Sequence, residues 1–190
     1  MKKLILNVFD EPSGGGRTAL LRNMIGDYAQ FGNDGKWELL GTGFTKLDES
    51  PGAQTDSEIY INEVTSSASI TGYETQFAYT SRMIPSQRAI YKLWKMGRDH
   101  ATGEDAELDL VKVDLFNPIG EASEDKAEFT ARKFRVVNQV SSTTGNGGEK
   151  IAVDGSFLAM GDPVQGKFDT VSRTFTEGDF KGKFDTEAAG

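Results

Sequence analysis

The chain has no cysteine and a single histidine, His100, among its 190 residues. The lack of cysteine excludes disulfide bonds, zinc ribbons and thiol nucleophiles, and it is compatible with a reducing compartment. The histidine lies in the segment GRDHATG at residues 97–103, and the chain has no Gly-x-Ser-x-Gly motif. Although Asp99 is its neighbour, adjacent residues rarely face each other as a catalytic pair. We therefore interpret His100 as a helix-end or loop residue.

An excess of positive charge and long apolar runs are also absent. The chain carries 21 Lys and Arg against 29 Asp and Glu, for a net charge of -8. This negative net charge argues against a surface that binds nucleic acid through its phosphates. No segment approaches the roughly 20 apolar residues of a membrane helix, and the apolar start of the chain is interrupted at Asn7. We expect no membrane span, no signal peptide and synthesis in a cytoplasm.

Motifs for ligands and metals are weak. Residues 14–18, Gly-Gly-Gly-Arg-Thr, lack the Gly-Lys-Ser/Thr ending of a phosphate loop and indicate a flexible turn. The acidic clusters at 104–109 and 121–128 do not have the ligand spacing of a calcium loop, so we interpret them as solvated acidic faces. The sequence predicts no catalytic, cofactor-binding or metal-binding residue, and we do not expect an enzyme.

What the chain does contain is a series of short extended segments separated by turn residues, including 22 glycines. Strands are predicted at residues 4–9, 37–44, 58–64, 70–79 and 108–115. In the segment 70–79, Phe77 and Tyr79 share a face, with Glu74 and Gln76 on the other. In 108–115, the apolar alternation changes phase between Leu110 and Val111, which indicates a β-bulge.

The C-terminal part, residues 133–184, predicts a β-meander of three extended segments. Its second turn contains Pro163, where we expect the chain to reverse and return antiparallel. The tail 177–190 is polar and is expected to be mobile until it meets a partner.

Two helices and one long loop complete the prediction. Residues 85–97 form the best helix, with proline in its first turn and late positive charges. Apolar residues at three-to-four spacing predict a shorter amphipathic helix over 18–29. A polar excursion over 48–56, with a Pro-Gly turn, predicts a loop that carries an interaction. The fold class is therefore mainly β, with one well-made flanking helix and long loops.

Several strings, taken in order, resemble the major tail proteins, or tail tube proteins, of long non-contractile-tailed bacteriophages. They are WELLGTGFTKLDESPGAQT at 37–55, YINE at 60–63, SITGYETQF at 69–77, GRDHATG at 97–103 and GDPVQGKFD at 161–169. The resemblance runs from about residue 20 to residue 175. The chain would then be one tail tube domain over 1–190, with arms at 1–16 and 177–190 that match less well.

The resemblance implies a β-sandwich or partial barrel with a helix outside, assembled as hexameric rings that stack into a hollow DNA conduit. Strands at 37–44, 70–79 and parts of the meander would line the tube, and a loop over 46–62 would reach a neighbouring ring. The candidate inter-ring residues are Asp48, Glu49, Pro51, Gln54, Asp56 and Tyr60. The candidate tube-wall residues are Glu74, Gln76, Asp154, Ser156 and Asp169.

The implied partners are other copies of the chain, a tape measure protein, a tail terminator and a distal tail protein, in a virion assembled in the host cytoplasm. Genomic DNA would pass through without specific binding, because carboxylates on the wall repel phosphate. Two alternatives remain open. One is a tube subunit of a phage-derived bacteriocin or secretion device, and the other is a carbohydrate-binding β-sandwich that uses Tyr73, Tyr79 or Trp94.

Overall fold

The computed structural model describes residues 19–32, 35–62, 64–121, 123 and 126–187. The strand predicted at 4–9, the turn at 14–18 and the N-terminal arm at 1–16 lie outside these residues. The strands are β1 Ile25–Gln30, β2 Trp37–Leu39, β3 Phe44–Ser50, β4 Ala53–Glu58, β5 Ser67–Tyr73, β6 Gln76–Arg82, β7 Glu107–Pro118, β8 Glu128–Thr144, β9 Ala152–Ala159, β10 Val164–Asp169 and β11 Thr174–Glu177. The helices are α1 Arg88–Arg98 and α2 Lys183–Glu187, with short 3-10 turns at Arg22–Met24 and Gly103–Ala106.

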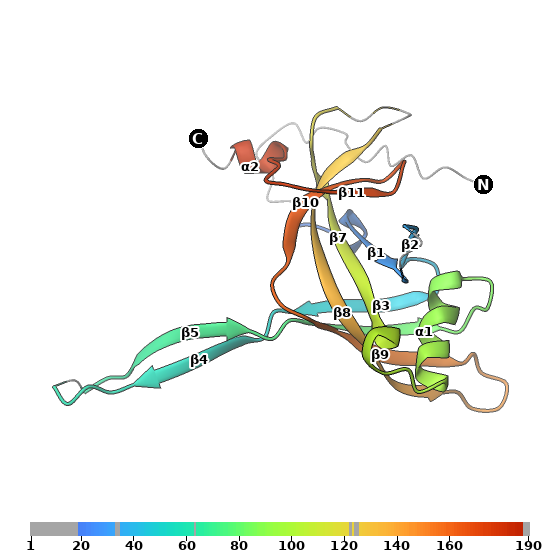
Figure 1. The fold of residues 1–190 in the computed structure, drawn as a ribbon, viewed down its shortest axis with the longest axis horizontal. Helices are drawn as coiled ribbons and strands as arrows, with labels where there is room; N and C mark the ends of the chain where they lie inside the picture. Colours follow the sequence, from blue (N-terminus) through green and yellow to red (C-terminus); the bar gives the residue numbers. More distant parts are fainter. Residues whose placement is uncertain (1–18, 33–34, 63, 122, 124–125, 188–190) are drawn as a thin grey trace.

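Among the described residues, nine strands form one antiparallel sheet. Seven follow the order β2-β1-β7-β8-β9-β6-β3, β10 also pairs with β8, and β11 pairs with β10. The other two strands, β4 and β5, form a small sheet of their own. Figure 1 shows this small sheet projecting from the body on one side, while α1 packs against the opposite side. Within the described strands the large sheet stays open, so the fold is mainly β with one substantial flanking helix, as the sequence predicts.

The centre of the large sheet is buried on both faces. Leu108 and Leu110 of β7 belong to one core, together with Phe77, Phe134 and residues of β3, β9 and α1. Val111 and Val113, on the opposite face of β7, belong to a second core. In this second core the rings of Tyr28 and Phe168 lie 4.5 Å apart, although β1 and β10 are separated by two strands. The sheet is therefore curled, so that its own strands help to cover the apolar side chains on both faces of β7.

This double burial corrects the prediction of a bulge at Leu110-Val111. Both residues pair regularly with β8, as Leu110 with Phe134 and Val111 with Lys133, and the irregularity in β7 lies between Val113 and Pro118. Adjacent apolar residues mark a strand that has a core on each side, because successive side chains point to opposite faces.

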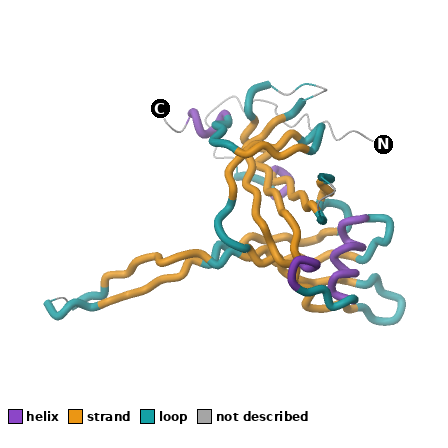
Figure 2. The backbone as a smooth tube through the Cα atoms, in the orientation of Figure 1, coloured by secondary structure: helices purple, strands orange, loops and turns teal. Residues whose placement is uncertain are grey.

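The C-terminal part is not a simple meander. After β9 pairs with residues 136–144 of β8, the chain passes Pro163 and continues as β10 along residues 128–133 of the same strand. The predicted reversal at Pro163 is therefore wrong. Pro163 interrupts the ladder without turning the chain back, and the long β8 provides one edge for both segments (Figure 2).

Helix α1 confirms the prediction for residues 85–97, with a small shift of its bounds. It buries Ala89, Ile90 and Leu93 and ends with basic residues in its last turn, where the negative end of the helix dipole favours them. A Cβ at Gly97 would lie 2.6 Å from the Cβ of Val140, so glycine allows the helix to lie close to β8. His100 follows the helix end, exposed and with a φ of 54°, which agrees with its predicted helix-end position.

The helix predicted over 18–29 is wrong, because its second part forms strand β1, preceded by a 3-10 turn at Arg22–Met24. Pairing on both sides overrides the local periodicity: β1 pairs with β2 through Tyr28 and Leu39 and with β7 through Tyr28 and Val111. Tertiary pairing of this kind commonly outweighs a weak helix pattern. The strand predicted over 37–44 is also split, into β2 and β3.

The described part of the C-terminal tail, residues 177–187, contacts the large sheet. Asn117 of β7 donates a hydrogen bond from Nδ2 to Asp185 Oδ2 at 2.8 Å, and its Oδ1 accepts one from the Phe184 backbone at 2.9 Å. Asp185 also accepts a hydrogen bond from the Gly182 backbone. These contacts hold the start of α2 against β7.

Candidate self-assembly site

The candidate site is a hairpin that extends into solvent from the body of the molecule, which is the large sheet together with α1. Strands β3 and β6 pair inside the body, and their continuations β4 and β5 pair with each other beyond it. Residues 53–73, which include β4, β5 and the connecting tip, are called the arm below (Figure 1). The segment predicted as a loop over 48–56 is thus mostly strand, and only Pro51-Gly52 interrupts it. Likewise, the predicted strand 70–79 is divided between β5 and β6, and most of 58–64 forms the tip.

The base of the arm is a defined joint. The Glu74 backbone donates a hydrogen bond to the Gly52 carbonyl at 3.0 Å, and the Thr75 hydroxyl donates one to the Pro51 carbonyl at 3.3 Å. Gly52 has a φ of 63°, and a Cβ there would lie 2.4 Å from the Glu74 carbonyl oxygen. Only glycine fits this position without strain.

The arm has almost no buried surface. In the described part of β4 and β5, every residue is exposed except Gly72, which is half-buried. The tip carries Tyr60, which is 54% exposed, together with Ile61 and Val64, which are almost completely exposed. Ile70 and Tyr73 add apolar surface along β5. An isolated two-stranded hairpin is marginally stable in water, and clustered exposed apolar residues commonly mark an interaction site.

The six candidate inter-ring residues divide between the body and the arm. Gln54, Asp56 and Tyr60 lie on the exposed arm, and Pro51 lies at its base. Asp48 is exposed on β3, where it pairs with Lys46 at 3.3 Å. Glu49 lies on the inner side of strand β3 rather than in a loop, and it forms ion pairs within the body.

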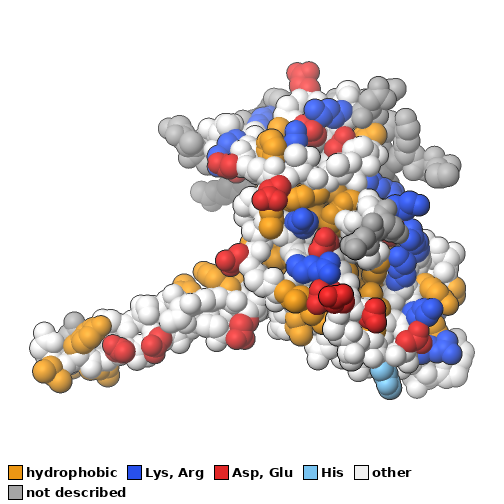
Figure 3. All heavy atoms as spheres, viewed as in Figure 1, with side chains coloured by type: hydrophobic (Ala, Val, Ile, Leu, Met, Phe, Trp, Pro, Cys, Tyr) orange, Lys and Arg blue, Asp and Glu red, His pale blue; other side chains and the backbone are white. Residues whose placement is uncertain are grey.

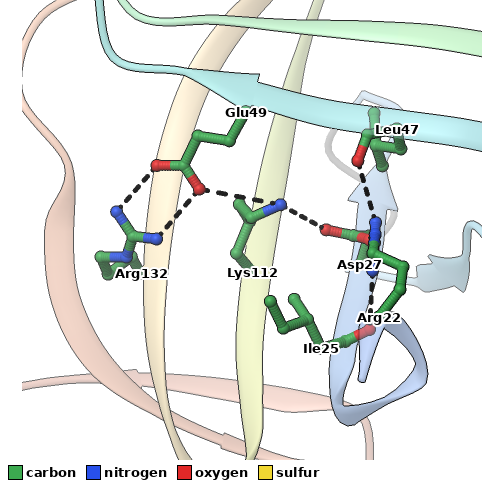
Figure 4. Close-up of polar contacts among 7 residues, drawn as sticks. All are labelled: Arg22, Ile25, Asp27, Leu47, Glu49, Lys112 and Arg132. Carbon is green, nitrogen blue, oxygen red and sulfur yellow. Dashed lines mark hydrogen bonds and ion pairs between the residues drawn. The ribbon is translucent and has the colours of Figure 1, made fainter. Parts of the chain in front are cut away.

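Glu49 belongs to a group of charged side chains that ties β3 across the curled sheet (Figure 4). Both of its oxygens accept hydrogen bonds from the Arg132 guanidinium at 3.0 Å. Lys112 Nζ lies 3.8 Å from Glu49 and 3.0 Å from Asp27, and both Lys112 and Asp27 are buried. Arg22 pairs with Asp27 and donates a hydrogen bond to the Leu47 carbonyl at 3.1 Å. These contacts connect β3 to β1, β7 and β8, strands that are remote from it in the sheet order.

The sequence analysis did not predict this group of charged side chains. A signal was present, since Lys112 stands between Val111 and Val113 in a segment that otherwise reads as buried strand. A lysine in such a position needs a buried carboxylate. The partner could not be identified from sequence, because Asp27 lies in the segment predicted as a helix. Nearby, burial raises the pKa of Asp114, and the facing Arg132 and Lys112 oppose that rise.

Three of the candidate tube-wall residues share one face of the sheet. Asp154 pairs with Thr80 and Ser156 pairs with Ala78, while Gln76 follows on β6. The carboxylate of Asp154 accepts hydrogen bonds from the Thr80 hydroxyl at 2.7 Å and the Ser142 hydroxyl at 3.3 Å. This polar face, opposite the core side of Phe77 and Tyr79, agrees with the alternation predicted for 76–79.

The other two wall candidates lie elsewhere. Glu74 lies at the base of the arm, where it is exposed. Asp169 ends β10 and holds a turn, accepting hydrogen bonds from the Val171 backbone at 2.9 Å and the Ser172 hydroxyl at 3.0 Å. Burial alone would raise its pKa, but these bonds and one from Ala127 outweigh burial and lower the pKa below the ordinary value. Asp169 is therefore a turn residue rather than part of the polar face.

The aromatic candidates for carbohydrate binding are not gathered at one site. Tyr79 is buried and donates a hydrogen bond to Asn138 Oδ1 at 2.9 Å. Trp94 is half-buried on α1, and Tyr73 lies on the arm. In the described residues, no group of three or more acidic, His or Cys side chains could hold a metal ion.

Comparison with known proteins gave no match, either to a protein-family model or to a curated protein. In the described part of the chain, none of the helices has the length and apolar character needed to cross a membrane.

Proposed function

We propose that this chain is a structural subunit of a phage tail tube, which assembles with copies of itself into stacked rings around a DNA conduit. The observation that carries the proposal is the arm. A two-stranded hairpin with an exposed apolar tip is a poor structure for a free monomer, but it becomes favourable when a neighbouring subunit covers it.

Two further features support self-assembly. Strands β2 and β3 end the order of the large sheet, and an edge strand is a ready site for pairing with another chain. The net charge of -8 suits a conduit for DNA, since a wall without excess positive charge offers phosphate few salt-dependent anchors. In this proposal the subunit works in the virion tail, after synthesis in the host cytoplasm, and has no catalytic task.

The test compares the full chain with a variant that lacks the arm. Residues 53–73 are replaced by Asn-Gly, a two-residue sequence that favours hairpin turns. Because Gly52 and Glu74 are already hydrogen-bonded, the body is expected to fold unchanged, as judged by circular dichroism and thermal unfolding. Negative-stain electron microscopy at high protein concentration should show rings or tubes for the full chain and monomers for the variant. A full chain that stays monomeric, or a variant that forms normal tubes, would contradict the proposal.

The related alternative is a tube from a phage-derived bacteriocin or secretion device, which would assemble in the same way. The neighbouring genes distinguish these sources, because a phage tail gene lies beside capsid and tape-measure genes. The carbohydrate-binding alternative is less well supported, since the buried Tyr79 is not available to stack on a sugar.

A further inference from the structure

The chain carries two oppositely charged surfaces at opposite ends of the molecule, and we infer that they bind each other between copies. The arm of one copy docks on the exposed basic face of α1 in the next copy. This inference rests on the proposed self-assembly, because it takes a second copy of the chain as the partner. The inference goes beyond the proposed function by identifying the surface of the second copy on which the arm docks.

The arm carries acidic side chains on β4 and no basic side chain. Between Lys46 and Arg82 the sequence has no Lys or Arg, and the arm itself carries Asp56, Glu58 and Glu63. Asp56 and Glu58 are exposed on β4. In Figure 3 the visible side of the arm shows apolar and acidic side chains without any basic one. A surface that receives the arm should therefore offer positive charge beside an apolar contact.

Helix α1 has the complementary composition. It carries Arg88, Lys92, Lys95 and Arg98 and has no Asp or Glu between its ends. At about 100° per residue these four side chains and Tyr91 fall on one side of the helix, opposite the buried Ala89, Ile90 and Leu93. Tyr91 is 42% exposed, so the face also offers an aromatic surface.

Two side chains of this basic face contact other residues of the same chain, and these contacts hold the face in place. Arg88 pairs with Glu38 of β2 at 2.8 Å, and the Lys92 ammonium lies 4.9 Å from the ring centre of Phe31. Lys95 is exposed in the described structure. We therefore expect Lys95 and Lys92 to be the principal contacts for the arm carboxylates.

A hollow of about 330 Å³ lies beside these lysines. It is lined by Lys92, Lys95, Met96, Asp99, Ala101 and Asp105. Met96 and Ala101 give it an apolar portion that can receive an aliphatic side chain of the arm tip, such as Ile61. Asp99 and Asp105 also line the hollow, so the acidic residues of β4 are expected to approach from the lysine side.

The positions of the two surfaces determine how copies associate. The arm extends from one side of the body and α1 covers the opposite side (Figure 1). The arm of a chain therefore points away from its own helix, so the contact must form between copies. Such a head-to-tail contact joins two different surfaces, and its repetition gives a closed ring or an open filament rather than a twofold dimer.

Disulfide cross-linking tests the contact directly, because the chain has no cysteine of its own. The variant Glu58→Cys/Lys95→Cys is oxidised under assembly conditions and analysed on a non-reducing gel. We expect a ladder of covalent multimers, since each copy would be joined to the next. The matched control Glu58→Cys/Lys126→Cys places the second thiol two residues before β8, remote from α1, and should give no more product than Glu58→Cys alone. Equal ladders from both pairs would overturn the inference.

Reversing the charges on both surfaces distinguishes a direct contact between the arm and α1 from a general loss of assembly caused by the substitutions. Asp56→Lys/Glu58→Lys and Lys92→Glu/Lys95→Glu should each raise the concentration needed for assembly by about tenfold. The chain with all four changes should assemble again near the wild-type concentration. Reversing Lys126 and Lys181, which are exposed and remote from α1, is the control and should leave assembly unchanged.

The outcomes distinguish this inference from the proposed function. If the wild type forms tubes but the four-change chain is no better than either double variant, α1 is not the docking surface, while the tube function stands. If the wild type does not assemble at any accessible concentration, both are overturned.

Discussion

The two halves of the long hairpin differ in what surrounds them. In the body half, β3 and β6 bury Leu47, Phe77 and Tyr79 to 4%, 0% and 2% exposure. In the arm half, the same chain continues as β4 and β5 with exposed side chains at all positions except Gly72. The backbone is antiparallel in both halves, and only Pro51-Gly52 and Glu74-Thr75 separate them.

This comparison shows that β-structure alone does not indicate where the stabilising contacts lie. The body half obtains them from its own chain, through two cores and the buried charges around Lys112. The arm half has no comparable set within the described chain, and we propose that its apolar residues contact another copy. The following predictions compare matched positions in the two halves.

The largest effect is expected for truncation of aromatic residues on the two sides of the joint. Phe77→Ala should lower the free energy of unfolding by about 3 to 5 kcal/mol, because it opens a cavity in the first core. Tyr73→Ala, four residues earlier on the exposed arm, should change it by less than about 0.5 kcal/mol. Urea unfolding of both variants at a concentration that keeps them monomeric checks this. A large loss for Tyr73→Ala would mean that the arm is packed in the monomer.

The next effect concerns charge. Asp27→Asn should cost about 3 kcal/mol, because it removes the carboxylate that lies 3.0 Å from the buried Lys112 ammonium. Asp48→Asn breaks only the exposed pair with Lys46 and should cost less than about 1 kcal/mol. Thermal unfolding of the two variants gives the comparison. Equal losses would contradict the role assigned to the buried charges in holding β3.

A smaller effect is expected for removal of one hydroxyl. Tyr79→Phe leaves the Asn138 Oδ1 without its 2.9 Å donor in the core and should cost about 1 to 2 kcal/mol. Tyr73→Phe is the matched change on the arm and should have no measurable effect on monomer stability. Chemical unfolding of both variants tests this, and an unchanged Tyr79→Phe would show that the buried hydrogen bond contributes little.

The smallest effect is a pH dependence that arises in the body. Because the folded pKa of Asp169 lies below its ordinary value, its carboxylate contributes stability above that ordinary value, and the contribution is lost as the pH falls through the folded pKa. Asp169→Asn should therefore reduce stability at neutral pH and lessen its decline on acidification below about pH 4. Unfolding measured across this range checks the sign. A variant with the same acid dependence as the wild type would contradict it.

The sequence predicted the features that depend on local patterns. Helix α1 follows from its apolar face and its flanking residues, and the alternation in β6 and β7 identifies most core positions. Features that depend on distant pairing were missed. Strand β1 was mistaken for a helix because its partners β2 and β7 override the local spacing, and Pro163 does not reverse the chain because β8 is long enough to pair with both neighbouring segments.

The candidate site was partly predictable for the same reason. The polar, proline-interrupted stretch around 48–56 correctly indicates an unusual excursion, and Gln54, Asp56 and Tyr60 do lie on the arm. Its form as a long exposed hairpin depends on pairing between β4 and β5. Glu49 could not be separated from its neighbours by sequence, because its role is set by Arg132 and Lys112, which come from β8 and β7.

Hydrogen-deuterium exchange in the dilute monomer and in the assembled state tests the central claim, that the arm is completed by another copy. Backbone amides of residues 53–58 and 67–73 should exchange quickly in the monomer and become protected on assembly, while those of β7 and β8 should be protected in both states. If the arm amides are as protected in the dilute monomer as in the assembly, or remain unprotected in the assembly, the claim is contradicted.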